Sequence, residues 1–179
     1  MCVLDKCRYP GLLLSMKNIV ILLFLCFSTI AACSQNAQND SLTGTYVLVS
    51  VDNIGKDGHH THLYGDKPQG LLIFDRAGNY SLQIMSQTRT KFASADKAKG
   101  TDEENRAAVK GCNAHFGIYA VDNDKGTITF SILHASFPNW EGTEQKRPFT
   151  LIDGMFKYIV PSPTTGAGVM GEVVWKKVK

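Results

Sequence analysis

From residue 42 onward, short apolar stretches alternate with turn residues at intervals typical of all-β barrels and sandwiches. The stretches predict eight strands, at about residues 45–51, 70–74, 79–85, 114–121, 127–134, 143–151, 155–160 and 169–178. Residues 100–110 break the pattern, because Thr101 and Glu104 fit a capping box that is followed by strong helix formers. We therefore expect one short helix between the third and fourth strands.

The next question is whether the eight predicted strands form an open sheet or a closed barrel. An open sheet would leave unpaired backbone groups along both edges, whereas pairing of the first strand with the last removes the edges. Eight strands enclose an interior that side chains or one small ligand can fill. The fold predicted for residues 42–179 is thus an all-β, eight-stranded antiparallel barrel.

The N-terminal residues have a different pattern. Residues 19–27 form an uncharged apolar run that follows Lys17 and precedes small residues, as in a signal peptide. This run is much shorter than the roughly 20 residues of a membrane-spanning helix, so cleavage is favoured over a permanent span. We expect residues 1–32 to be the signal peptide. Met16 is a better start of translation than Met1, and residues 1–15 would then be a misplaced start.

The end of this segment, Ile30-Ala-Ala-Cys33, resembles the lipobox of bacterial lipoproteins. The resemblance implies that Cys33 carries lipid and that the exported protein is anchored in the bacterial cell envelope, with Ser34 favouring the outer membrane. The alternative is an ordinary signal peptide followed by an unmodified thiol. The polar residues up to 41 are expected to form a tether, so that residues 33–41 join the lipid to the barrel.

Charge and cysteine content restrict the classes of partner and the disulfides that we expect. From residue 33 onward, 16 Lys and Arg face 15 Asp and Glu, and no basic patch with interleaved aromatic residues occurs, so nucleic acid is not a predicted partner. If Cys33 is lipidated, Cys112 is a lone thiol, and we expect it to be buried and inert. No cofactor is predicted, and the oligomeric state is left open.

Several stretches of the chain resemble one known family. Gly44-Thr-Tyr46 is similar to the Gly-x-Trp signature of lipocalins, with Tyr in place of Trp. Residues 68–74, 92–94, 100–104, 116–119 and 137–140 are similar to the bacterial and fungal lipocalin-like domain family. The resemblance covers about residues 42–177 and implies a calycin-type barrel with an internal cavity. The family pattern has a histidine near Phe130 and Ser131, where this chain has none, so no family role is transferred to His134.

Arg147 is the most informative polar residue, since alternation places it on one face with Phe149 and Leu151. An arginine among inward side chains must be paired or must meet an anionic ligand. A bidentate hold on a carboxylate would suit a fatty-acid-like ligand. The alternatives are a solvent-facing arginine or a structural ion pair with a nearby acid, namely Glu141, Glu144 or Asp153.

Other polar and aromatic residues are candidates for the same ligand site. Alternation also aligns residues 128, 130, 132 and 134 on one face. Trp140 lies in the connection between the fifth and sixth strands, so it either contacts ligand at the barrel mouth or plugs the barrel floor. The candidates besides Arg147 are Tyr46, Tyr80, His115, Tyr119, Phe130, His134 and Trp140.

The histidines at 59, 60 and 62 are the only cluster suited to metal, but imidazoles in one loop do not make a closed set of ligands, so no metal site is predicted. The favoured function is binding of a small hydrophobic or amphipathic molecule. One alternative is a barrel enzyme, an isomerase, cyclase or hydrolase with His115 or His134 as general base. The other is a structural envelope protein without ligand, which a cavity smaller than about 300 Å³ would favour.

Overall fold

The structure, a computed structural model, describes residues 41–164 and 170–178. Its strands are β1 (Gly44–Ile54), β2 (His60–His62), β3 (Gln69–Phe74), β4 (Asn79–Met85), β5 (Cys112–Asp122), β6 (Thr127–Ala135), β7 (Glu144–Ile152), β8 (Met155–Val160) and β9 (Met170–Lys177). The helices are α2 (Asp102–Lys110) and the short 3-10 helices η1 (Lys97–Lys99) and η2 (Pro138–Trp140). The predicted signal peptide, Cys33 and most of the predicted tether lie outside the described residues.

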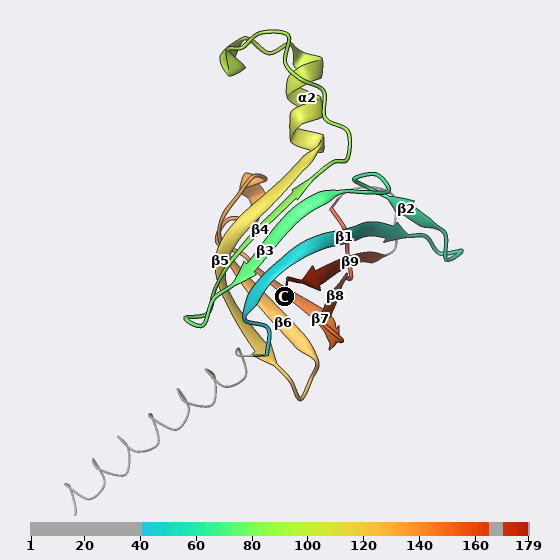
Figure 1. Ribbon diagram of the computed structural model, residues 1–179, viewed down its shortest axis with the longest axis vertical. Helices are drawn as coiled ribbons and strands as arrows, with labels where there is room; N and C mark the ends of the chain where they lie inside the picture. Colours follow the sequence, from blue (N-terminus) through green and yellow to red (C-terminus); the bar gives the residue numbers. More distant parts are fainter. Residues whose placement is uncertain (1–40, 165–169, 179) are drawn as a thin grey trace, which may run out of the picture. The chain divides into compact units, whose positions relative to one another are not determined.

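All strands except β2 form a closed antiparallel barrel (Figure 1). They pair in the order β1, β3, β4, β5, β6, β7, β8, β9, and β9 returns to β1 through a ladder that runs from Tyr46↔Lys177 to Ile54↔Met170. The predicted eight-stranded barrel is therefore confirmed. The additional strand β2 pairs with the last residues of β1, on the side where β3 pairs with its first residues.

Helix α2 lies between β4 and β5, which are the third and fourth strands of the barrel. Thr101 begins it with both bonds of a capping box: its side chain accepts from the backbone N–H of Glu104, and Glu104 accepts from the backbone N–H of Thr101. None of the helix residues is buried. The helix extends beyond the ends of β4 and β5 rather than covering the barrel wall (Figure 1).

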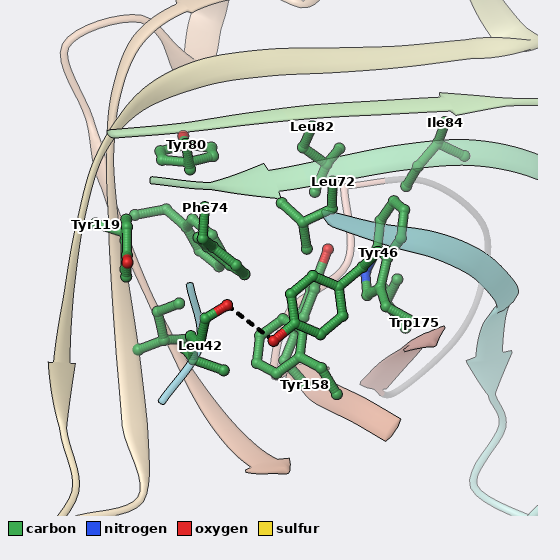
Figure 2. Packing of buried hydrophobic residues seen from close by; sticks show 14 of the residues in the cluster. Leu42, Tyr46, Leu72, Phe74, Tyr80, Leu82, Ile84, Tyr119, Tyr158 and Trp175 are labelled. Carbon is green, nitrogen blue, oxygen red and sulfur yellow. Dashed lines mark hydrogen bonds between the residues drawn. The ribbon is translucent and has the colours of Figure 1, made fainter. Parts of the chain in front are cut away.

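One end of the barrel is filled by side chains (Figure 2). Leu42, which precedes β1, is fully buried, and its carbonyl accepts a 2.8 Å hydrogen bond from the Tyr46 hydroxyl. The ring of Tyr46 meets Phe74 and Phe156 at centroid distances of 5.9 and 5.8 Å. Trp175 is also fully buried. We call this the closed end of the barrel.

A β-bulge in β6 changes which side chains point inward. Phe116 pairs with His134 but Gly117 pairs with Ile132, which leaves Leu133 unmatched. Ile132 is buried, whereas Leu133 and His134 are both exposed. The expectation that His134 shares the inward face of Phe130 and Ile132 is therefore wrong, because the extra residue shifts the alternation by one position.

Gly117 is required at this bulge. A Cβ atom at position 117 would lie 2.0 Å from the carbonyl oxygen of Ser131 and 2.9 Å from the backbone nitrogen of Leu133. Both contacts are with backbone, which cannot move aside as the end of a flexible side chain could. The close approach of β5 and β6 at the bulge thus depends on a residue without a side chain.

Candidate functional site

A cavity of about 90 Å³ lies at the end of the barrel opposite the closed end. Its walls come from the last residues of β1, the segment after β2, and the ends of β4 to β9 that face away from Leu42. Apolar side chains share the walls with a small set of polar ones. The polar lining residues include Asn113, His115, Gln145, Arg147 and Tyr158.

Arg147 reaches the cavity from β7. Along this strand exposed residues alternate with half-buried ones, and Arg147 belongs to the half-buried set with Gln145, Phe149 and Leu151. Its Nη2 donates to Gln145 Oε1 at 2.7 Å, and its Nη1 donates to the carbonyl of Lys146 at 3.4 Å. Burial lowers the pKa of Arg147, an effect that nearby Tyr158 partly opposes.

No carboxylate pairs with this guanidinium among residues 41–164 and 170–178. The acids considered as structural partners behave otherwise: Glu141 lies 3.4 Å from His134, and Glu144 accepts from the hydroxyl of Ser131 at 3.3 Å. Asp52 also lines the cavity, but it is held by His60 and His62 rather than by Arg147. The guanidinium therefore has no ion-pair partner in the described residues and keeps most of its donors available.

His115 adds a neutral imidazole to the same cavity. It is buried, and its Nδ1 lies 2.8 Å from the hydroxyl of Tyr80. Burial lowers the pKa of His115 to about 4, with a smaller contribution from the positive charge of Arg147. The ring is therefore neutral at pH 7. Because Nδ1 is taken by Tyr80, Nε2 is the ring nitrogen that remains for a ligand.

Aromatic rings cover part of the cavity. Trp140, on η2, lines it and stands edge-on to His115 at a centroid distance of 5.9 Å. Phe137 also packs edge-on to Trp140, at a centroid distance of 5.5 Å. Phe130 also lines the cavity and packs against Tyr80 at 4.8 Å. Of the two places considered for Trp140, the structure gives the one at the cavity, not the floor of the barrel.

The barrel wall is irregular beside Arg147. Residues Phe149–Ile152 of β7 pair with β8, but the earlier residues of β7 pair with β6 alone. Pro148 stands at this change, and proline has no N–H with which to continue a ladder. Gln145 and Arg147 on one side, and Tyr158 and Val160 on the other, all line the cavity. Side chains rather than a backbone ladder thus form the wall here.

The segment after β2 supplies another wall. Leu63 and Tyr64 line the cavity beside Asn113. Burial raises the pKa of the Tyr64 hydroxyl, and a hydrogen bond with Asn113 partly opposes this. The Oδ1 atom of Asn113 is buried and has no hydrogen-bond partner in the described part of the chain. It is therefore a free acceptor at the cavity wall.

The structure brings together four of the predicted ligand contacts, since His115, Phe130, Trp140 and Arg147 all line the cavity. Tyr80 lies behind them and reaches the cavity through His115. The remaining candidates, Tyr46, Tyr119 and His134, do not line it.

Tyr46 and Tyr119 lie toward the closed end, and the hydroxyl of each donates to a backbone carbonyl. Tyr46 donates to the carbonyl of Leu42, and Tyr119 donates to the carbonyl of Asp75 at 3.0 Å. His134 lies on the outer side of β6, where its ring meets Phe116 at 5.5 Å. His134 and Phe116 line a separate hollow of about 310 Å³ over β4, β5 and β6.

Several lining residues were not among the predicted contacts. Gln145 shares the inward face of Arg147, so strand alternation contained the signal for it. Asn113 lies on β5 two positions before His115, so alternation would have placed it on the same face had the strand been predicted to begin earlier. Tyr64 lies outside any strand, where alternation carries no information. The placement of Tyr64 at the cavity depends on how the segment after β2 folds back over the barrel.

The described residues also bear on metal binding and on membrane insertion. Over residues 41–164 and 170–178, no group of three or more His, Cys, Asp or Glu side chains is arranged to hold a metal ion. None of the helices in these residues is long and apolar enough to cross a membrane. Cys112 is a free thiol and is half-buried rather than buried.

A family model described as a lipocalin-like domain matches residues 43–178. This match includes every strand of the barrel and every residue that lines the cavity. No curated protein sequence matches the chain.

Proposed function

The chain belongs to the lipocalin-like domain family, and from that premise we propose that its barrel binds a small amphipathic molecule with an anionic head. The head lies in the cavity beside Arg147, Gln145 and His115, and the apolar part lies against Trp140 at the end of the barrel. Lipocalin-like barrels in general suggest binding of small ligands, and the anionic head is the finer part of the proposal.

The observation that carries this proposal is that Arg147 is half-buried and has no carboxylate partner in the described part of the chain. A half-buried cation without a carboxylate partner is costly to keep in a protein interior, and an anionic ligand would offset that cost. Its guanidinium shape suits two oxygens of a carboxylate, sulfate or phosphate group. The neutral His115 beside it adds a hydrogen-bonding group without adding a competing charge.

The cavity volume limits how much of the ligand is enclosed. Sites that bury a drug-sized molecule have about 300–1,000 Å³, whereas this cavity has about 90 Å³. Such a volume encloses a polar head but not a whole fatty acid. The proposed ligand is therefore held by its head, and its apolar part extends along the cavity mouth.

A pair of fluorescent probes tests the proposal. 1-Anilinonaphthalene-8-sulfonate is anionic, and N-phenyl-1-naphthylamine is the same ring system without the sulfonate. Both are titrated into residues 35–179, which form a compact unit of their own. The variant Arg147→Gln should weaken the sulfonate probe about tenfold or more, because a hydrogen bond to a charged group contributes about 1.5–3 kcal/mol.

The neutral probe serves as the first control and should lose less than about twofold in affinity. The variant Lys146→Gln is the second control, because it removes the same charge from an exposed position next to Arg147 on β7. It should leave both affinities unchanged. Equal weakening of the two probes by Arg147→Gln would refute the anionic anchor.

The subcellular localisation of the protein is a separate part of the proposal. We propose that Cys33 carries a lipid that anchors the barrel in a bacterial envelope membrane, most readily the outer membrane. The lipobox-like Ile30-Ala-Ala-Cys33 after an apolar run supports this. Mass spectrometry of the full chain purified from a bacterial host should find a lipidated Cys33 as the first residue. An unmodified mature N-terminus at another position would refute the anchor.

Two observations bear on the alternatives. His115, the general base of the enzyme hypothesis that lies at the cavity, has its pKa lowered to about 4, which makes it a weak base at neutral pH. The small cavity favours a structural barrel without ligand, and that alternative predicts that neither probe binds. The same titration therefore distinguishes it from the binding function.

A further inference from the structure

A buried carboxylate holds β2 against the barrel. Asp52 on β1 is opposite His62 in the β1–β2 pairing, and only 9% of its side chain is exposed. His62 Nδ1 lies 2.6 Å from Asp52 Oδ1, and His60 Nδ1 lies 3.3 Å from Asp52 Oδ2. The two histidines are two positions apart on one strand, so both point to the same side and each takes one oxygen of the carboxylate.

This contact and the burial of Asp52 depend on each other. A buried carboxylate is costly unless donors satisfy its oxygens, and here the donors are the two rings of β2. Asp52 also strengthens the attachment of β2, which pairs with β1 through only three residue pairs, from Asp52↔His62 to Ile54↔His60. Loss of the carboxylate charge should therefore loosen β2.

The attachment of β2 matters for the cavity because the residues directly after this strand belong to the cavity wall. Leu63 is the first of them, and its backbone N–H donates to the carbonyl of Val51 at 3.1 Å. Leu63 and Tyr64 form one wall of the cavity, and Val51, Asp52 and Asn53 of β1 line it as well. Asp52 thus lies at the cavity and also holds the short strand that leads into the wall formed by Leu63 and Tyr64.

We propose that Asp52 is a positioning residue for ligand binding: through His60 and His62 it holds the wall formed by Leu63 and Tyr64, and ligand affinity follows the protonation of His62. This inference rests on the proposed binding function of the cavity. It assigns a role to the histidine cluster that does not require a metal ion.

The charged groups around His62 determine the direction of the pH effect. Besides Asp52, the exposed Asp66 lies 3.9 Å from His62 Nε2. On β9, Glu172 is opposite Asp52 and pairs with Lys157 of β8 at 3.2 Å. In the turn before β2, Asp57 accepts from the backbone N–H of His59 at 3.0 Å. The acids nearest to His62 therefore favour its protonated form.

The hydrogen bond to Asp52 and then the charge of Asp52 raise the pKa of His62, with a small addition from Asp66. A histidine with a raised pKa contributes its full stabilisation below its ordinary pKa of about 6.5, and the contribution is lost as pH rises through the raised value. Attachment of β2, and ligand affinity with it, should therefore be greatest at mildly acidic pH and should fall above it.

The test measures affinity for 1-anilinonaphthalene-8-sulfonate between about pH 6 and pH 9 on residues 35–179. Affinity of the unchanged chain should fall by about fivefold over this range, the lower end of usual coupling between sites. Asp52→Asn and His62→Gln should bind weakly throughout and lose the pH dependence. Asp66→Asn is the control, and this variant should keep most of the pH dependence. A uniform loss of affinity with an unchanged pH profile would mean a merely structural role and overturn the proposal.

Hydrogen exchange of the Leu63 amide tests, without any ligand, whether Asp52 and the two histidines hold β2 in place. We call this contact of Asp52 with His60 and His62 the clamp. Its protection factor should decrease from pH 6 to pH 9 in the unchanged chain and should not change with pH in His62→Gln, a variant at an exposed position that leaves the barrel core intact. If neither probe binds but this pattern holds, the binding function fails and the clamp stands. If protection does not depend on pH in the unchanged chain, the clamp is overturned.

Discussion

His115 should make the barrel sensitive to acid, and its surroundings determine the size of the effect. The residue is buried between Phe130 and Trp140, with ring centroids 6.1 and 5.9 Å away, and burial lowers its pKa to about 4. The unfolded chain takes up a proton on this residue near pH 6.5, whereas the folded chain takes it up near pH 4. Between these values only the unfolded state binds the proton.

Stability therefore increases with pH in this window. One extra proton bound by the unfolded state changes the free energy of unfolding by about 1.4 kcal/mol per pH unit. Over the difference between pH 6.5 and about 4 this amounts to about 3 kcal/mol. The contribution is present above pH 6.5 and is lost as pH falls through the folded value.

Urea denaturation of residues 35–179 at a series of pH values measures this effect. His115→Asn is the informative variant, because an amide at this position can keep a partner for the hydroxyl of Tyr80. The variant should be less stable at neutral pH, since packing against two aromatic rings is lost. Its free energy of unfolding should fall by about 3 kcal/mol less than that of the unchanged chain between pH 6.5 and pH 4. Parallel curves for the two chains would refute the reasoning.

Two other predictions concern the fold alone. Gly117→Ala should destabilise the barrel by about 2 kcal/mol or more in urea denaturation, because the new Cβ atom would lie 2.0 Å from the Ser131 carbonyl oxygen; an effect within error would mean that the bulge can relax. Tyr46→Phe should cost about 1 kcal/mol, because the carbonyl of Leu42 loses its donor in a buried place. It should leave probe affinity unchanged, and a loss of affinity would show that the closed end contributes to the site.

Much of the fold could be predicted because its signals are local. Alternation and turn residues indicate the strands, and the capping box at Thr101 and Glu104 indicates α2. Strand β2 could not be predicted in this way, since His60-Thr-His62 is polar throughout. Its pairing depends on Asp52, which belongs to another strand.

The site could be predicted only in part because its geometry depends on distant residues. The inward position of Arg147 follows from alternation along β7 alone. The outward position of His134 depends on Gly117 of the neighbouring strand, which allows the bulge. The position of the cavity depends on Leu42, which fills one end of the barrel and thereby leaves the Trp140 end for a ligand.

The chain contains two tryptophans, and they report on the two ends of the barrel. Trp140 lines the cavity, whereas Trp175 is fully buried and does not line it. The most direct test of the central claim is an NMR titration of residues 35–179 with 1-anilinonaphthalene-8-sulfonate, in which the two indole N–H signals are followed. We predict that the Trp140 signal shifts with probe concentration, that the Trp175 signal stays in place, and that Arg147→Gln weakens the response. A response of Trp175 alone, or none from either indole, would contradict it.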